Sequence, residues 1–368
     1  MHILVTADTL GGVWTYTREL VTGLVRGGDS VTLVSFGDIP APDQMRWMEG
    51  LPNLDYRPTA FKLEWMMDSE ADMRASAQLL EALIQECRPD LLHLNQFYYG
   101  ALRSDVPRIV VAHSDVVSWW HSVHHAAPPE SDWLRWYRRI VEHGLSEATV
   151  VVAPSRWMLE QVKHFYRKPE LSSVIYNGRT PTLFHPDISK KDTILTVGRV
   201  WDGGKNAGLL LRHKMPAPVY IVGSDRHPDS LSSAFLAEEI RPEIHLEPHQ
   251  DERQLALTMA RTGIYAATSQ YEPFGLAPVE AALSRCAIVA SDIPSFRELW
   301  DGVAVFFRNN DADSLRETLN NLVRDPEWRR KQANLAYRHA LQKFTAERMV
   351  AGYRNLYHSL VPAQALTA

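Results

Sequence analysis

The stretch GIYAATSQYEPFGLAPVEAAL, residues 263–283, carries three signals that together decide the fold around it. Its first part, residues 263–268, is an apolar run that predicts a buried strand. Residues 281–283 predict a helix, and Gly275 lies in the turn between strand and helix. The free N–H groups of such a turn and the positive end of the helix dipole face the same point. The stretch therefore predicts an anion-binding site.

Two carboxylates flank this turn. Glu272 precedes the expected helix, and Glu280 falls in its first turn or two, with seven residues between them. Carboxylates accept hydrogen bonds from hydroxyl groups, so two of them beside an anion site suit a ligand with many hydroxyls and a phosphate. A nucleotide-sugar has this combination of groups.

Residues 272–280 resemble the Glu-x7-Glu motif of the retaining glycosyltransferases of family 4, which have the GT-B fold. The similarity extends over most of the chain. The resemblance implies that Glu272 holds the hexose of a donor and that Glu280 bonds the ribose hydroxyls. It also implies that the hexose contacts the backbone amides of Phe274, Gly275 and Leu276. The alternative is a surface Glu and a helix-capping Glu around an ordinary loop.

The length and the alternation of elements predict the architecture. A chain of 368 residues exceeds the size at which one core stops growing, so two domains are expected. Strand-like and helix-like segments alternate in both halves, which predicts parallel, doubly wound sheets. The expected strands are 3–6, 31–36, 91–94, 109–112, 149–153 and 174–176, then 194–197, 219–222, 244–246, 264–268 and 287–290. We expect an α/β protein of the GT-B type, with two Rossmann-like domains whose sheets face a central cleft.

The domain boundaries follow from the same pattern. Residues 1–180 are expected to form an N-terminal domain on the acceptor side, and residues 181–343 a C-terminal domain that binds the donor. Residues 177–192 are rich in Pro, Thr, Lys and Asp and predict a linker. A long amphipathic helical stretch covers residues 313–357. The last helix of GT-B proteins crosses back to the first domain, so the resemblance implies such a crossing for residues 344–368.

A second motif, GRVWDGGKN at residues 198–206, follows the first strand of the second half. Two cations on a glycine-rich loop suit a diphosphate, because Arg offers a planar fork of donors and Lys a compact charge. The segment resembles the Gly-Arg…Lys motif of the same family, which assigns Arg199 and Lys205 to the diphosphate of the donor. The alternative is a solvated, charged loop.

The chain departs from the family at several positions, among them Ala287, where a proline is usual, and Pro248, which replaces a common glycine. Asn206 and Arg285 stand where a glycine is usual, and Arg179 follows Asn177-Gly178, where the family often has an Asp. None of these changes removes a catalytic group. They leave open which nucleobase and which sugar the site accepts.

Two positions in the first half complete the expected donor site. Gly11-Gly12 follows the first strand, and glycine permits a phosphate to approach the backbone closely, although the segment is not a GxGxxG. Its position matches the N-terminal glycine loop of the family, which implies that Gly12 contacts the donor phosphates. His113 ends the strand 109–112, where a family His approaches the transferred hexose. The alternative for His113 is a loop histidine satisfied by the backbone.

Aromatic and histidine side chains crowd one region of the first half, namely Trp119, Trp120, His121, His124, His125, Trp133 and Trp136. Flat aromatic faces stack on sugars and planar acceptors, and the alternative is aromatic packing under a loop. These histidines lack the Cys or carboxylate spacing of a metal site, so no metal is expected. The acceptor stays open as a glycan, a lipid or a small aromatic molecule.

The composition disfavours several other classes of protein. A formal net charge of -5 gives no sign of a nucleic-acid binder. Cys87 and Cys286 lack CxxC or metal-type partners and are expected to be buried free thiols, as in a reducing compartment. The first residues predict a strand rather than a signal peptide, and no apolar run reaches the ~18 residues of a membrane span. We expect a cytoplasmic protein whose membrane contact is at most peripheral.

The resemblance therefore implies a retaining, metal-independent hexosyltransferase, and no cofactor is expected. It would move a hexose from a nucleoside-diphosphate sugar to an acceptor hydroxyl, keeping the α configuration. UDP-glucose is the first expectation for the donor and GDP-mannose the second. The missing Rossmann fingerprint disfavours a dinucleotide-dependent oxidoreductase. The open alternatives are a GT-B-like epimerase or phosphorylase and a non-catalytic nucleotide-sugar-binding module.

Overall fold

The computed structural model describes residues 1–224 and 240–361, and these residues divide into two compact units. The first unit contains residues 1–121, 126–177 and 346–361, and the second contains residues 122–125 and 178–345 as far as they are described. The chain thus leaves the first unit after Asn177 and returns to it at Ala346.

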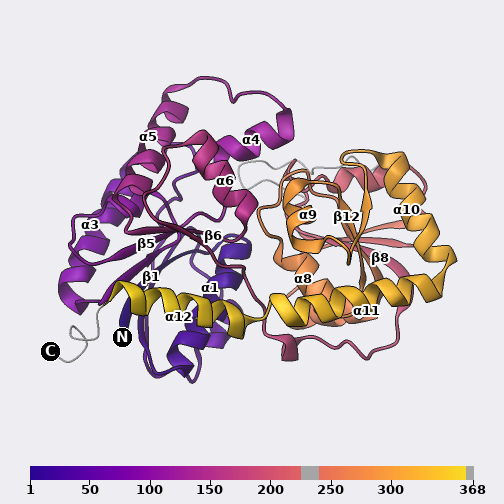
Figure 1. Ribbon diagram of the computed structural model, residues 1–368, viewed down its shortest axis with the longest axis horizontal. Helices are drawn as coiled ribbons and strands as arrows, with labels where there is room; N and C mark the ends of the chain where they lie inside the picture. The colour runs from indigo at the N-terminus through magenta and orange to yellow at the C-terminus, as the bar shows by residue number, and fades with distance from the viewer. Residues whose placement is uncertain (225–239, 362–368) are drawn as a thin grey trace. The chain divides into compact units, whose positions relative to one another are not determined.

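Within the described residues, the first unit is built on a seven-stranded sheet in the order β3-β2-β1-β4-β5-β6-β7 (Figure 1). Its strands are β1 (His2–Asp8), β2 (Ser30–Phe36), β3 (Leu54–Pro58), β4 (Leu91–Leu94), β5 (Arg108–Val111), β6 (Val150–Ala153) and β7 (Ser172–Val174). All neighbours are parallel, and Ile3 of β1 pairs with Val31 on one side and Leu91 on the other. The central strands β4, β5 and β6 are buried throughout and mostly apolar, as is typical of a parallel sheet covered on both faces.

The helices of the N-terminal half are α1 (Gly12–Arg26), α2 (Pro42–Met45), α3 (Glu70–Cys87), α4 (Val116–His124), α5 (Asp132–Glu147) and α6 (Arg156–Phe165), with short 3₁₀ helices at Arg46–Met48 and Tyr98–Ala101. Ser155 caps α6, because its Oγ accepts a hydrogen bond from Met158 N at 3.1 Å. The edge strand β3 and the helix α4 were not expected from the sequence.

The second unit is built, in the part that the structure describes, on a six-stranded parallel sheet in the order β10-β9-β8-β11-β12-β13. Its strands are β8 (Lys191–Val197), β9 (Val219–Val222), β10 (Ile244–Glu247), β11 (Thr262–Ala267), β12 (Ala287–Ser291) and β13 (Val305–Phe307). Its helices are α7 (Glu252–Arg261), α8 (Leu276–Leu283), α9 (Pro294–Trp300), α10 (Ala312–Arg324) and α11 (Pro326–Lys343), with 3₁₀ helices at Pro181–Leu183 and Ala207–Leu211. The strand order reverses direction between β8 and β11, and parallel sheets bind ligands at the carboxyl ends of the strands at such a point.

The C-terminal helix α12 (Ala346–Leu360) belongs to the first unit, where it lies along α1 (Figure 1). Gly23 of α1 permits this packing, because a Cβ there would lie 2.5 Å from a methyl carbon of Val350. The expected fold, with two Rossmann-like units and a last helix that returns to the first, is confirmed. The helical stretch expected over residues 313–357 consists of three helices. Asp325 and Pro326 end α10 and begin α11, and Phe344 and Thr345 separate α11 from α12.

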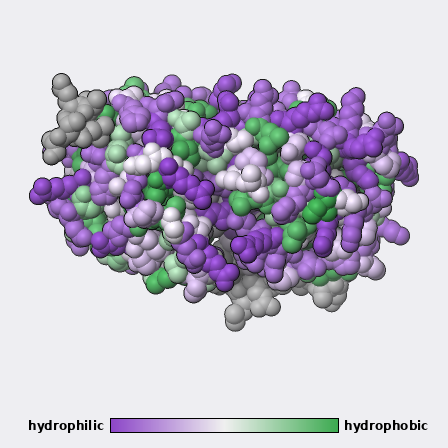
Figure 2. All heavy atoms as spheres, turned by 90° about the horizontal axis from the view of Figure 1, so that it is seen from below, coloured by the Kyte–Doolittle hydropathy of each residue, from purple (hydrophilic) through white to green (hydrophobic). Residues whose placement is uncertain are grey.

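The face of the molecule drawn in Figure 2 carries mostly hydrophilic residues, with hydrophobic ones in scattered groups. Among residues 1–224 and 240–361, the exposed large hydrophobic side chains lie far apart in sequence and are Ile39, Met67, Leu171, Leu257 and Leu341. Scattered apolar side chains are normal on a folded protein. Among the described helices, none has both the length and the apolar character that crossing a bilayer would demand.

Candidate active site

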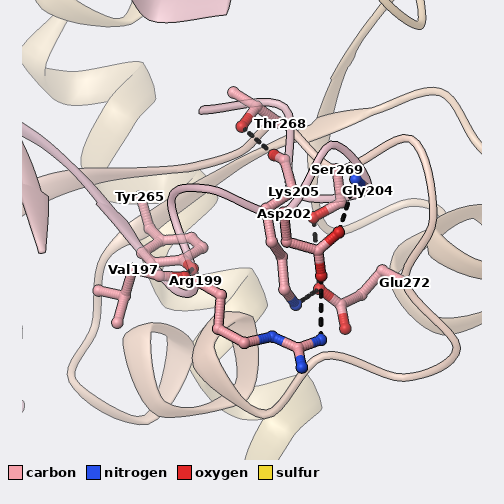
Figure 3. A network of polar contacts seen from close by, with 9 residues as sticks. All are labelled: Val197, Arg199, Asp202, Gly204, Lys205, Tyr265, Thr268, Ser269 and Glu272. Carbon is pink, nitrogen blue, oxygen red and sulfur yellow. Dashed lines mark hydrogen bonds and ion pairs between the residues drawn. The ribbon is translucent and has the colours of Figure 1, made fainter. Parts of the chain in front are cut away.

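The candidate site lies in the second unit, where the loop after β8 carries two cations. Arg199 Nη2 pairs with Asp202 Oδ2 at 2.9 Å, and Asp202 Oδ1 accepts a hydrogen bond from Gly204 N at 2.8 Å (Figure 3). The Asp202 side chain is almost fully buried, whereas Arg199 is more than one-third exposed. Asp202 therefore fixes the turn of the loop and leaves the guanidinium accessible to a ligand. Asp202 was not expected as a site residue, although an Asp before two glycines is a turn signal.

Glu272 meets this loop directly. Lys205 Nζ lies 2.5 Å from Glu272 Oε2, and Ser269 Oγ lies 3.3 Å from the same oxygen (Figure 3). Both side chains of the ion pair are mostly buried, with 26% of Lys205 and 12% of Glu272 exposed. A Lys ammonium has three donors, so Lys205 can hold Glu272 and a phosphate oxygen at the same time. Arg199, Lys205 and Glu272 are thus brought together at the β8–β11 switch point.

Backbone contacts join the loop after β8 to the loop after β11. Thr268 Oγ1 donates to the carbonyl oxygen of Lys205 at 2.9 Å (Figure 3). Gly204 O accepts from Gln270 N at 2.8 Å. The two motifs that lie far apart in sequence therefore form one rigid patch. Its four charged groups, two cations and two carboxylates, sum to zero formal charge.

The departure at Asn206 has a physical explanation. Asn206 has a φ of 48° in the left-handed region, at the N-terminus of the following 3₁₀ helix. Asn tolerates this conformation better than most residues, so it substitutes for the glycine that is usual there. Arg285, at the other unusual position, also has a positive φ, of 62°. Both residues therefore adopt the left-handed conformation that glycine favours.

The turn before α8 presents backbone amides rather than side chains. Gly275 precedes the first residue of α8 with a φ of 84°, a conformation that glycine adopts without strain. Phe274 is buried and packs edge-on against Phe344, with ring centroids 5.3 Å apart. Its side chain therefore holds the turn in place, which leaves its backbone, with that of Gly275 and Leu276, to face a ligand at the positive end of the helix.

Glu280, the fifth residue of α8, lies in a buried ion-pair cluster. Its Oε1 is 2.8 Å from Arg179 Nε, and Arg179 Nη2 donates to Glu252 Oε1 at 2.5 Å. The exposed fractions are 2% for the Arg179 side chain, 10% for Glu280 and 32% for Glu252. Buried charges are stable only when they are paired, so the three side chains form one unit.

The remaining expected residues lie in the first unit, at the carboxyl ends of its strands. Gly12 is the first residue of α1 rather than part of a loop, and it is exposed. His113 follows β5, and its Nε2 lies 2.8 Å from Asn95 Oδ1. Asn95 Nδ2 donates to the carbonyl oxygen of Thr6 at 2.6 Å, which fixes the amide with its oxygen toward His113. Nε2 of His113 must therefore carry a proton, and Nδ1 of the neutral ring is an acceptor.

A second histidine, His93 of β4, connects this strand to the helices α1 and α12. Tyr16 of α1 packs edge-on against His113, with centroids 4.6 Å apart, and its hydroxyl lies 3.0 Å from His93 Nε2. Tyr357 of α12 places its hydroxyl 2.7 Å from His93 Nδ1. Loss of hydration lowers the pKa of both His93 and His113 to about 3, with a smaller contribution to His93 from the charge of His113. Both rings are therefore neutral near pH 7.

These two histidines predict acid sensitivity. A folded-state pKa below the unfolded value of about 6.5 means that the unfolded chain binds more protons, so stability falls as pH drops from about 6.5 toward 3. Each ring contributes up to about 1.4 kcal/mol of lost stability per pH unit in that window. We expect His93→Gln to flatten the dependence of the melting temperature on pH. His358→Gln, at an exposed position of α12, should leave it as steep as in the unchanged protein, and an equal slope in all three would refute this origin.

The aromatic and histidine side chains that crowd one region of the first half pack in part against one another and their neighbours. Trp133 stacks on Tyr137 with centroids 5.4 Å apart, and His121 stacks on Phe165 at 4.6 Å, so part of the aromatic region serves packing. Among residues 1–224 and 240–361, no cluster of three or more His, Cys, Asp or Glu side chains is arranged to hold a metal ion.

A Rossmann-like unit with an Arg and a Lys at its switch point, beside a helix N-terminus and two acids, has the arrangement that suits an anionic ligand with hydroxyl groups. Comparison with known families agrees with this arrangement. The model described as Glycosyltransferase Family 4 matches residues 10–182, and the model described as Glycosyl transferases group 1 matches residues 188–339. The chain belongs to the family 4 glycosyltransferases with the GT-B fold.

Individual relatives are distant. An O-antigen chain mannosyltransferase of Salmonella typhimurium is 21% identical over 52% of this chain, and the match spans only 56% of that relative's own length. The alpha-maltose-1-phosphate synthase of Mycolicibacterium smegmatis is 26% identical over 72% of this chain and 76% of its own length.

Solved structures share the fold over nearly the whole chain. Sucrose-phosphate synthase from Thermosynechococcus elongatus has a TM-score of 0.82 at 18% identity, covering 98% of this chain and 99% of that one. The Anabaena protein HepE in complex with UDP-glucose has a TM-score of 0.76 at 17% identity, covering 98% of this chain and 100% of that one. At such identities the likeness concerns the fold alone.

Proposed function

We propose that the protein is a retaining glycosyltransferase that moves a hexose from a nucleoside-diphosphate sugar to an acceptor hydroxyl. The observation that carries the proposal is the joining of Arg199, Lys205 and Glu272 into one rigid patch beside the N-terminus of α8. UDP-glucose is the first donor to consider, since a structural neighbour was solved with it, and GDP-mannose the second, since a relative is a mannosyltransferase.

The cations act on the leaving group. When the bond between the anomeric carbon and the diphosphate oxygen breaks, that oxygen gains negative charge, and Arg199 and Lys205 stabilise it where it forms. The acceptor oxygen bonds to the same face of the anomeric carbon, and its proton passes to the departing phosphate oxygen. Fixed cations and backbone amides thereby supply the charge that a metal ion would otherwise bring, so the transfer is proposed to be metal-independent.

The other site residues position the sugar and the nucleoside. Glu272, held by Lys205, accepts hydrogen bonds from hexose hydroxyls rather than acting as a nucleophile, and Glu280 accepts from the ribose. His113 is neutral and has an acceptor at Nδ1, so it binds a hexose hydroxyl and does not carry charge. Gly12 presents a helix N-terminus to the donor phosphates.

The test is incubation of the purified protein with a panel of nucleotide-sugars, first alone for thermal stabilisation and then with glycan, lipid and small aromatic acceptors for turnover. We expect one donor to raise the melting temperature and to give an α-linked product from an α-linked donor. A β-linked product would refute retention. Turnover that requires an added divalent ion after treatment with a chelator would refute metal independence.

The alternative activities predict different products. An epimerase would convert the donor without an acceptor, and a phosphorylase would need inorganic phosphate or release a sugar phosphate. A non-catalytic module would bind the donor without any product. The free cysteines, Cys87 and Cys286, are compatible with the expected cytoplasmic location, which is part of this proposal.

The ribose assignment gives a separate prediction. Glu280→Ala should weaken binding of the nucleoside diphosphate about tenfold or more, because a hydrogen bond to a charged group contributes about 1.5–3 kcal/mol. Isothermal titration calorimetry with the nucleoside diphosphate alone measures this loss without involving the hexose. Glu298→Ala, in α9 of the same unit, is the matched removal of a carboxylate outside the site. Equal affinity of the Glu280 variant and the unchanged protein would refute the ribose role.

A further inference from the structure

Arg179 is the least exposed charged side chain in the candidate site, and it stands where the family often has an Asp. It follows the last residues of the first unit, and its backbone N donates to Phe344 O at 2.9 Å. A bridge to Thr345 holds the same segment beside the end of α11. The guanidinium carbon lies 5.4 Å from the centre of the Phe184 ring. Its position is therefore fixed from three sides before any acid is considered.

The two acids that Arg179 contacts come from different helices. Glu252 is the first residue of α7, and Glu280 is the fifth residue of α8. Arg179 reaches both with its planar guanidinium, because Nη2 donates a hydrogen bond to Glu252 and Nε lies within ion-pair distance of Glu280, 2.8 Å from its Oε1. A Lys ammonium is a single point and cannot reproduce both directions with the same geometry.

The pairing defines the orientation of Glu280. Contact with Arg179 involves Oε1, and a carboxylate has about four lone-pair sites, so this contact by itself uses only part of the accepting capacity of Glu280. One cation and two carboxylates leave the cluster with a net formal charge of -1. Such a cluster attracts hydroxyl donors and not further anions, which suits a ribose and does not suit a phosphate.

We propose that Arg179 is a positioning residue that orients Glu280 for the two ribose hydroxyls of the donor, and thereby sets the preference for a ribonucleotide over a deoxyribonucleotide. The inference rests on the proposed function, because Glu280 has a ribose to bind only in a nucleotide-sugar site. It adds that the discrimination at the ribose depends on a residue that does not touch the ligand.

A purely structural role for Arg179 makes a different prediction. Removing a buried cation leaves two carboxylates uncompensated and destabilises the unit whatever the site does. Stability therefore does not decide between the two roles. The ratio of the affinities for UDP and 2′-deoxy-UDP does, because an overall loss of folded protein or of diphosphate binding affects both ligands equally.

The experiment measures this ratio by calorimetry, with GDP and 2′-deoxy-GDP as a second pair of probes. The variants are Arg179→Met, Arg179→Lys and, as a control, Arg329→Met. Arg329 is also largely buried and paired with an acid, Asp192, but at the start of β8, the strand end opposite the site. Its replacement removes a buried cation from the same unit without changing the surroundings of Glu280.

We expect the unchanged protein and Arg329→Met to prefer the ribonucleotide about tenfold or more. Arg179→Met should reduce this preference to less than about threefold, and Arg179→Lys should reduce it at least threefold. If Arg179→Met does not fold, Arg179→Lys decides alone. A full preference in the folded Arg179 variants would overturn the inference and leave the proposed function intact. No preference in the unchanged protein would overturn the Glu280 assignment and this inference with it, and binding of neither UDP nor GDP would overturn the proposed function itself.

Discussion

Lys205→Ala should lower the rate of transfer at least a hundredfold. The ammonium is expected to contact the diphosphate and holds Glu272 at 2.5 Å, so its loss removes a cation from the leaving group and releases the carboxylate that positions the hexose. Comparable groups that stabilise developing negative charge contribute about 2.7–4 kcal/mol, which is about 10²–10³ in rate. The measurement is kcat/KM for the donor identified in the panel screen, at saturating acceptor.

Two companion variants locate the effect. Arg199→Ala should produce a loss of similar size, because Arg199 is the second cation of the same loop and is held there by Asp202. Lys191→Ala should have no effect, because Lys191 is an exposed lysine at the opposite end of the same strand, β8. A rate for Lys205→Ala within tenfold of the unchanged protein would rule out the diphosphate role of this loop.

The fold could be predicted from the sequence where the strands are long apolar runs. The buried strands β1, β2, β4, β5, β6, β9, β11 and β12 were all expected, because central strands of parallel sheets are apolar on both faces. The edge strand β3, Leu54–Pro58, has two exposed charged residues and a proline, so no apolar run marks it. β13, Val305–Phe307, is too short to give a periodic signal. Edge strands depend on pairing with a neighbour, which a single sequence does not reveal.

The candidate site could be predicted to the level of its motifs but not of its internal contacts. The distance between Lys205 and Glu272 in sequence gave no sign that they form an ion pair, because only the pairing of β8 with β11 brings their loops together. Arg179 was noted as unusual, yet its burial between α7 and α8 depends on the path of the chain after the first unit. Asp202 acts through the turn it stabilises, and turn signals are common on any surface.

Gly223→Ala should impair the site without changing any of its functional side chains. A Cβ on Gly223, which follows β9, would lie 1.9 Å from the carbonyl oxygen of Gly198, and the φ of 142° is itself unfavourable for alanine. Real contacts of this kind do not occur, so the segment Gly198–Arg199 must move away from the sheet. We expect kcat/KM to fall tenfold or more, together with a loss of about 1–3 kcal/mol in the stability of the second unit.

Gly302→Ala separates the clash from the backbone strain. Gly302 lies in the same unit with a positive φ of 75°, and nothing lies within 4 Å of a Cβ placed there. Its replacement should cost about 1–2 kcal/mol through the left-handed conformation alone and leave kcat/KM unchanged. If Gly223→Ala loses no more activity than Gly302→Ala, the position of the Arg199 loop does not limit the reaction. A selective loss in Gly223→Ala, at equal amounts of folded protein, ties the rate to the geometry of that loop, because the cations remain in the chain and only their placement has changed.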